Sequence, residues 1–293
     1  MCQSFKIFRL PSVALDVVLN EFAIEEIFNL SQCTKRSHAK MKQFIRRRSY
    51  ISSLQLGHTC NFTISVVNGW EDMKFKKETY DCIQEKEDGD QVLREDLRLE
   101  IFRLLDFFRP RTSLSIISNS VLEPLVSMVT LLNLNLTDVF ISGHVKPNFE
   151  LYKLSLSVFK DCTKLQCHAK PPKKFEYENI VQFTCVKIDI AFSFWVTVDN
   201  IVNGFMDCET VILQDCEILA NSLYHIIRKW LDSRSRLKKM DLMLRGKGGS
   251  IPIGDIHRDI PHRKVDEDYV IRREDGIEAN ISYSHGRFKM SVV

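Results

Sequence analysis

Short apolar runs recur at a nearly constant spacing between residues 113 and 244, and this rhythm constrains the fold more than any other feature. The runs start 25, 26, 22, 24 and 30 residues apart, at Ser113–Ile117, Asp138–Ser142, Lys164–Cys167, Val186–Ile190, Thr210–Leu213 and Met240–Leu244. Helical patterns fill several of the gaps, at Val121–Leu132, Phe149–Phe159, Val198–Met206 and Ile218–Leu231. Strands that alternate with helices at this spacing predict parallel β-α-β units, and therefore the α/β class.

A period of about two dozen residues also lies in the leucine-rich-repeat range. Because the units share little sequence, we predict a degenerate leucine-rich-repeat-like β-α arc. A closed, doubly wound sheet is the alternative, but no glycine-rich turn follows any predicted strand, which argues against a nucleotide site. After a predicted surface turn at Gly246–Ser250, Glu278–Ser282 and Arg287–Val293 alternate in polarity and predict a terminal antiparallel hairpin.

The N-terminus is a short segment with an excess of apolar residues. Leu10-Pro11 can begin a helix because proline at the first helical position gives up an N–H that would be unpaired. Apolar spacings of three and four predict a second helix over Ile24–Leu30, and a third runs from Thr34 to Arg48. Three helices in under fifty residues cannot enclose this apolar volume, so we expect one side to form half of an interface.

The third predicted helix is strongly basic. No acidic residue occurs from Ser31 to Leu56, whereas seven basic residues do: Lys35, Arg36, Lys40, Lys42, Arg46, Arg47 and Arg48. The net charge of the whole chain is only +3, so the rest is mildly acidic. Nucleic-acid binding is one interpretation of this asymmetry. A solvated basic helix end is the other, and no aromatic platform or zinc spacing favours nucleic acid over it.

The remaining composition argues for an intracellular protein, in the cytoplasm or nucleus, without a membrane span. The nine cysteines are odd in number and lack a C-x-x-C pair, as expected for reduced core thiols. No stretch of ~18 apolar residues is present. We also find no nucleophile motif, no phosphate-loop spacing and no complete zinc ligand set around Cys162, Cys167 and His168. We therefore expect no catalysis, no cofactor and no metal.

The N-terminal residues resemble the F-box, the helical module by which substrate receptors dock onto the Skp-type linker of cullin–RING ubiquitin ligases. The match has no gap over about 27 residues and rests on Leu10-Pro11, Val18-Leu19, Phe22, Ile27, Leu30, Cys33-Thr34 and Lys35-Arg36. Two positions depart from the usual pattern. Ala23-Ile24 stands where Asp-Pro or Asn-Pro is common, and Ser37-His38 stands near the position of a frequent tryptophan. These departures motivate the alternative of a degenerate F-box paralogue without a ligase role.

The later part of the chain is similar to the F-box-associated domain, type 2, of a nematode-expanded family. The similar blocks are Trp195–Ile201, Cys208–Leu213, Leu223–Leu231, Leu237–Leu242 and Ile271–Gly276. Trp195 and Trp230 adjoin apolar segments, so we expect them to pack in the core rather than to contact a substrate.

The resemblance implies a non-catalytic adaptor with an F-box at residues 5–48, a connecting region at 49–98 and a substrate-recruiting domain at 99–293. Its implied partners are the Skp-type linker, through it a cullin, and an unknown protein substrate; nucleic acid is the less favoured partner. The residues implied to bind the linker are Leu10, Pro11, Val18, Leu19, Phe22, Ile27, Leu30, Cys33, Lys35 and Arg36. Some of them must instead pack the module internally, and the substrate-binding residues are not predicted.

Overall fold

The computed structural model describes residues 7–67, 74–85, 91–178, 181–245, 259–265 and 268–293. The chain forms two compact units, Met1–Asn135 and Leu136–Val293. The predicted turn at Gly246–Ser250, most of the polar stretch 85–90 and the first two residues of the predicted module lie outside the described residues. Within the described residues, no helix is both long enough and apolar enough to cross a membrane.

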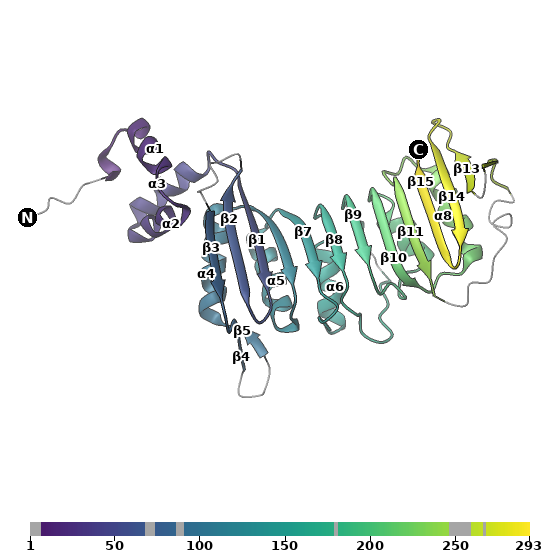
Figure 1. Ribbon diagram of the computed structural model, residues 1–293, viewed down its shortest axis with the longest axis horizontal. Coiled ribbons are helices and arrows are strands. Elements are labelled where there is room, and N and C mark those ends of the chain that lie inside the picture. Colours follow the sequence, from purple (N-terminus) through teal and green to yellow (C-terminus); the bar gives the residue numbers. More distant parts are fainter. Residues whose placement is uncertain (1–6, 68–73, 86–90, 179–180, 246–258, 266–267) are drawn as a thin grey trace, which may run out of the picture. The chain divides into compact units, whose positions relative to one another are not determined.

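The first unit begins with helices and continues into a mixed sheet (Figure 1). Its helices are the 3-10 turn Ile7–Arg9, α1 Ser12–Asn20, α2 Ile24–Cys33, α3 Lys35–Ile45, α4 Glu95–Phe108 and α5 Asn119–Leu132. Its strands are β1 Tyr50–Leu56, β2 Cys60–Val66, β3 Lys74–Thr79, β4 Ile83–Glu85, β5 Gln91–Leu93 and β6 Arg111–Ile116. The sheet order is β6-β1-β2-β3, with β1 parallel to β6 and antiparallel to β2. Strands β4 and β5 form a separate antiparallel pair.

Local hydrogen bonds explain where the N-terminal helices begin. The Thr34 hydroxyl accepts the backbone N–H of Ser37 at 3.0 Å, and the Ser37 hydroxyl accepts the N–H of Thr34 at 2.8 Å. This reciprocal cap separates α3 from α2. The start of α2 lacks a capping side chain at Ala23, but the Glu26 carboxylate accepts the Ala23 N–H at 2.8 Å. The helix therefore forms despite the unusual Ala23-Ile24 pair.

The second unit alternates strands and helices and ends in antiparallel strands. Its helices are α6 Phe149–Val158, α7 Val198–Asn200, the π-helical turn Ile201–Phe205, the 3-10 turn Ala220–Ser222 and α8 Leu223–Asp232. Its strands are β7 Leu136–Ile141, β8 Lys164–Cys167, β9 Lys187–Ile190, β10 Thr210–Cys216, β11 Lys239–Leu244, β12 His262–Val265, β13 Asp268–Arg272, β14 Glu278–Ser284 and β15 Arg287–Val292. Strands β7 to β11 are parallel neighbours in chain order, and β15, β14, β13 and β12 follow β11 as antiparallel neighbours.

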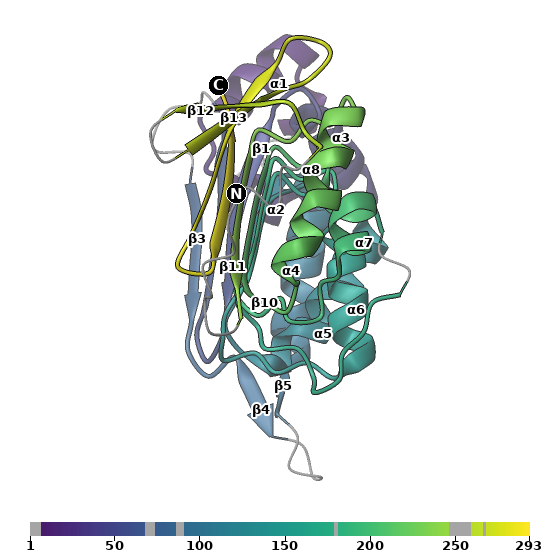
Figure 2. The same ribbon diagram turned by 90° about the vertical axis from the view of Figure 1, so that its right-hand side faces the viewer.

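The predicted α/β class, the six predicted strands and the C-terminal hairpin are confirmed. The hairpin turn is His285-Gly286, and both residues have positive φ, 50° and 74°. Positive φ at both central residues defines the type I′ turn that suits a right-twisted hairpin. In the described part of the second unit, α6, α7 and α8 lie on one face of the strands (Figure 2). This one-sided arrangement differs from a doubly wound sheet.

The structure differs from the sequence prediction at residues 49–98, which were expected to form a connection. This segment instead contains β1, β2 and β3 of the first sheet. The alternation in β1 is hard to detect because polar Ser52 points inward and apolar Ile51 is exposed. Ser52 is accommodated because its hydroxyl lies 3.0 Å from the Thr112 hydroxyl of β6, which satisfies both buried groups.

Candidate partner-binding surfaces

The structure separates the ten residues implied to bind a linker into three groups. Leu19 and Ile27 are core residues, with exposed fractions of 0% and 1%. Leu10, Val18, Phe22 and Leu30 are half-buried, and Pro11, Cys33, Lys35 and Arg36 are exposed. Leu19 and Ile27 therefore pack the module internally and cannot contact a partner without unfolding it.

Two large apolar residues outside that set are exposed on α1. Val13 is 76% exposed and Val17 is 60% exposed. They are four residues apart, so they lie on the same face of the helix. Leu15 and Leu19 are buried and form the opposite stripe. We call Pro11, Val13 and Val17, with half-buried Leu10 and Val18, the α1 apolar surface.

The other two N-terminal helices are partly covered by the chain itself. The Phe28 ring of α2 packs edge-on against Phe107 of α4, with ring centroids 5.7 Å apart. His38 of α3 also contacts Phe107, at 5.3 Å. The chain itself therefore covers part of α2 and α3, and the large apolar residues of the three helices that stay exposed are Val13 and Val17 of α1.

A pocket of about 680 Å³ lies at the carboxyl ends of the parallel strands in the second unit. Strand β10 supplies Asp215, and the loops that follow β8, β9, β10 and β11 supply Lys170, Lys173, Lys174, Phe175, Glu176, Phe192, Phe194, Trp195, Thr197, Glu217 and Arg245. Phe192 and Phe194 are half-buried, and Lys170 lies over the Phe192 ring at 6.0 Å. Crevices at the carboxyl ends of parallel strands are common ligand positions in α/β proteins. We call this the carboxyl-edge pocket.

A buried aromatic cluster holds the loops of the carboxyl-edge pocket in place. The Phe175 ring is 4.8 Å from Tyr152 of α6 and 5.3 Å from Trp195, both edge-on. Trp195 is buried, and its indole N–H donates to the Phe192 carbonyl at 3.1 Å. The prediction that Trp195 is a core residue is confirmed. Because Trp195 lies below the loops and binds the Phe192 carbonyl, it holds the half-buried Phe192 and Phe194 in the pocket wall.

In the second unit, the helix-free face of the strands is a charged surface. Strand register places Lys164 beside Lys187, Lys187 beside Thr210, and Thr210 beside Lys239. Next to this row, Asp241 accepts two hydrogen bonds from Arg287, at 2.7 and 2.6 Å. The Arg287 hydrogen bonds to Asp241 raise the pKa of the guanidinium.

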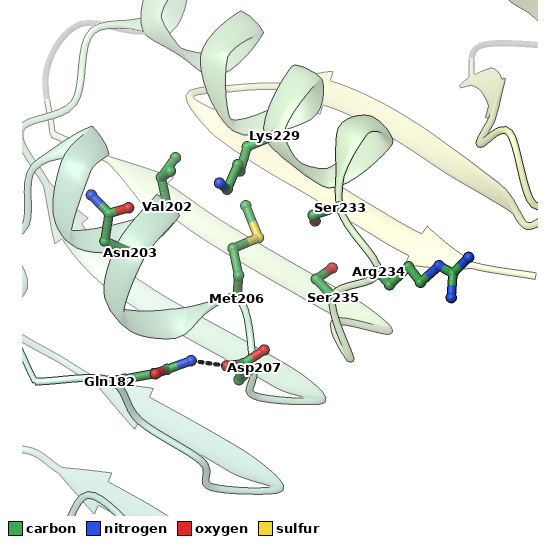
Figure 3. A pocket seen from close by; sticks show the side chains of 9 residues that line it. All are labelled: Gln182, Val202, Asn203, Met206, Asp207, Lys229, Ser233, Arg234 and Ser235. Carbon is green, nitrogen blue, oxygen red and sulfur yellow. Dashed lines mark hydrogen bonds between the residues drawn. The ribbon is translucent and has the colours of Figure 1, made fainter.

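A smaller pocket of about 390 Å³ lies near the amino ends of β9, β10 and β11 (Figure 3). The Ser233 and Ser235 hydroxyls are buried there without a hydrogen-bond partner among the described residues. Their backbone carbonyls accept from Arg273, at 3.1 and 3.5 Å. Figure 3 shows the Arg234 guanidinium directed away from the other lining side chains.

Most cysteines among the described residues are packing residues. Seven of them are buried: Cys60, Cys82, Cys162, Cys167, Cys185, Cys208 and Cys216. Burial raises the pKa of Cys60 and of Cys216 to about 12, so both are protonated at neutral pH. Cys167 contacts the Tyr152 hydroxyl at 3.7 Å below the sheet, whereas neighbouring His168 stacks edge-on with Phe140. Among the described residues, no group of three or more His, Cys, Asp or Glu side chains could hold a metal ion.

Thiol labelling tests this arrangement. In a Cys2→Ser chain, where the one cysteine outside the described residues is removed, a disulfide reagent should label Cys33 at least about a hundredfold faster than the buried thiols. A further Cys33→Ser change should remove the fast phase completely. Rapid labelling of two or more thiols in the folded chain would contradict the buried positions.

Comparisons with known proteins do not identify a family, because no family model, curated protein or solved structure matches this chain.

Proposed function

We propose that the chain is a substrate receptor of a cullin–RING ubiquitin ligase of the Skp–cullin–F-box type. The single observation that carries the proposal is the α1 apolar surface, in which Val13 and Val17 are exposed beside Pro11. It lies within the gapless stretch that resembles an F-box. Covering apolar side chains contributes roughly 25 cal/mol for each Å² removed from water, so this surface favours a protein partner.

In this proposal the N-terminal helices bind the Skp-type linker and the second unit binds a protein substrate. The linker contacts would be Leu10, Pro11, Val13, Val17 and Val18, with Phe22, Leu30, Cys33, Lys35 and Arg36 at the rim. The second unit would correspond to the degenerate leucine-rich-repeat-like arc. The adaptor would work inside the cell, carry out no chemistry and need no cofactor, since other subunits transfer ubiquitin.

Two surfaces of the second unit could hold the substrate, and the carboxyl-edge pocket is favoured. It combines half-exposed Phe192 and Phe194 with lysines, and aromatic anchors within a polar rim are typical of interface hot spots. The charged helix-free face offers fewer apolar anchors. In its Asp241–Arg287 ion pair, Asp241 is buried and the two side chains already bind each other.

Mixing the purified chain with a Skp-type linker tests the proposal. At about 100 μM of each protein, roughly a hundred times a Kd of about 1 μM, about nine-tenths of the chain should be bound, and most of the protein should elute as a one-to-one complex in size-exclusion chromatography with light scattering. Two separate peaks at that concentration would contradict linker binding and favour the degenerate-paralogue alternative.

A further inference from the structure

A second pocket in the first unit has an unusual charge. It has a volume of about 400 Å³ and lies where α3 and α4 end. Its lining consists of Lys42, Ile45, Arg46, Arg48, Phe107, Phe108 and Arg109. Four of these seven residues are cationic and none is acidic. We call it the basic pocket; it shares no residue with the α1 apolar surface.

The floor of the basic pocket is rigid and apolar. Ile45, Phe107 and Phe108 are all buried. The Phe107 and Phe108 rings meet edge-on at 4.9 Å, and Phe108 also contacts Tyr50 at 5.1 Å. A preformed floor of this kind lowers the ordering cost of binding a ligand above it.

The cations around the floor are not all equally available. Arg109 forms the wall: its guanidinium pairs with Asp106 at 2.5 Å and also donates to the Leu132 carbonyl. Arg48 packs over the Phe44 ring at 4.6 Å. Lys42 and Arg46, in contrast, have no carboxylate partner among the described residues. The partial negative charges at the carboxyl ends of α3 and α4, about half an elementary charge each, offset only part of this excess.

We propose that the basic pocket binds a compact phosphate-bearing anion, such as a ligand with two or three linked phosphate groups. Guanidinium groups present a planar fork of donors that matches phosphate oxygens, and Arg46, which has no carboxylate partner among the described residues, supplies such a group to the lining of the pocket. A volume of about 400 Å³ lies within the range of small-molecule sites. A hollow with an apolar floor suits a compact ligand better than the flat strip that a nucleic-acid backbone would need.

Titration of the full-length chain with inorganic tripolyphosphate at 150 mM salt tests the proposal. Changing Lys42→Gln and Arg46→Gln together should weaken tripolyphosphate binding by at least about tenfold, because it removes two charge-assisted contacts. The matched control is Lys40→Gln with Arg103→Gln, which removes two exposed cations of α3 and α4 outside the pocket. At this salt concentration, where charges separated by more than about 8 Å are screened, the control should bind within twofold of the original chain.

Four outcomes would overturn the assignment. They are no binding at millimolar tripolyphosphate, equal losses in the two double variants, citrate binding as tightly as tripolyphosphate, and binding of duplex DNA that tripolyphosphate does not displace. Thermal unfolding of both variants controls for folding. The experiment is independent of linker binding, so its failure would leave the proposed adaptor function untouched.

Discussion

Replacing Val13 and Val17 together by aspartate should weaken binding to the Skp-type linker by at least about 100-fold. Each valine that an interface covers contributes roughly 1.5 kcal/mol or more, and an unpaired carboxylate in its place adds a desolvation cost. A total near 3 kcal/mol corresponds to about a hundredfold change in Kd. Since both side chains are mostly exposed in the free chain, folding stability should change little.

Leu131→Asp is the matched control for the valine variant. Leu131 is 76% exposed, as Val13 is, and it also lies on a helix of the first unit, α5. Isothermal titration should give this control the affinity of the original chain. Equal linker affinity for the valine double variant and the original chain would show that the α1 apolar surface is not the docking site.

Replacing Trp230 by alanine should destabilise the second unit by about 3–5 kcal/mol, the usual cost of truncating a buried aromatic side chain. Trp230 is 0% exposed and lies on α8. Its indole N–H donates to the Leu237 carbonyl at 3.3 Å, and the Arg273 guanidinium lies 5.2 Å from the ring centroid. The change would create a cavity and remove this hydrogen bond and the cation–π contact together.

Urea unfolding followed by circular dichroism measures this effect without relying on tryptophan fluorescence. The Trp230→Phe variant retains most of the volume and should lose clearly less stability than Trp230→Ala. A loss below about 1 kcal/mol for the alanine variant would mean that Trp230 is not a core residue and would reopen its assignment to substrate binding.

The regular part of the fold could be predicted from the sequence because its strands are short apolar runs with helical patterns between them. The predicted segment Lys164–Cys167 coincides with β8, and Thr210–Leu213 begins where β10 begins. Strand β1 was missed because its inward positions include Ser52, whose partner Thr112 is sixty residues away. A local pattern carries no information about such a distant hydrogen bond.

The candidate surfaces could be predicted only in part. Helix α1 is apolar on both sides, so its sequence does not reveal that Leu15 and Leu19 face the core while Val13 and Val17 face outward. The four-residue spacing of Val13 and Val17 does indicate that both side chains lie on one face of the helix. The individual residues of the carboxyl-edge pocket could not be predicted, because they come from the ends of four strands and the loops after them, which are far apart in the sequence.

Hydrogen exchange of the chain with and without the Skp-type linker tests the adaptor account most directly. The account predicts that the α1 amides, Ser12–Asn20, exchange at least about tenfold more slowly in the complex, while those of α5, Asn119–Leu132, are unchanged. Unchanged exchange over α1 in a saturated mixture, or protection confined to the second unit, would contradict it.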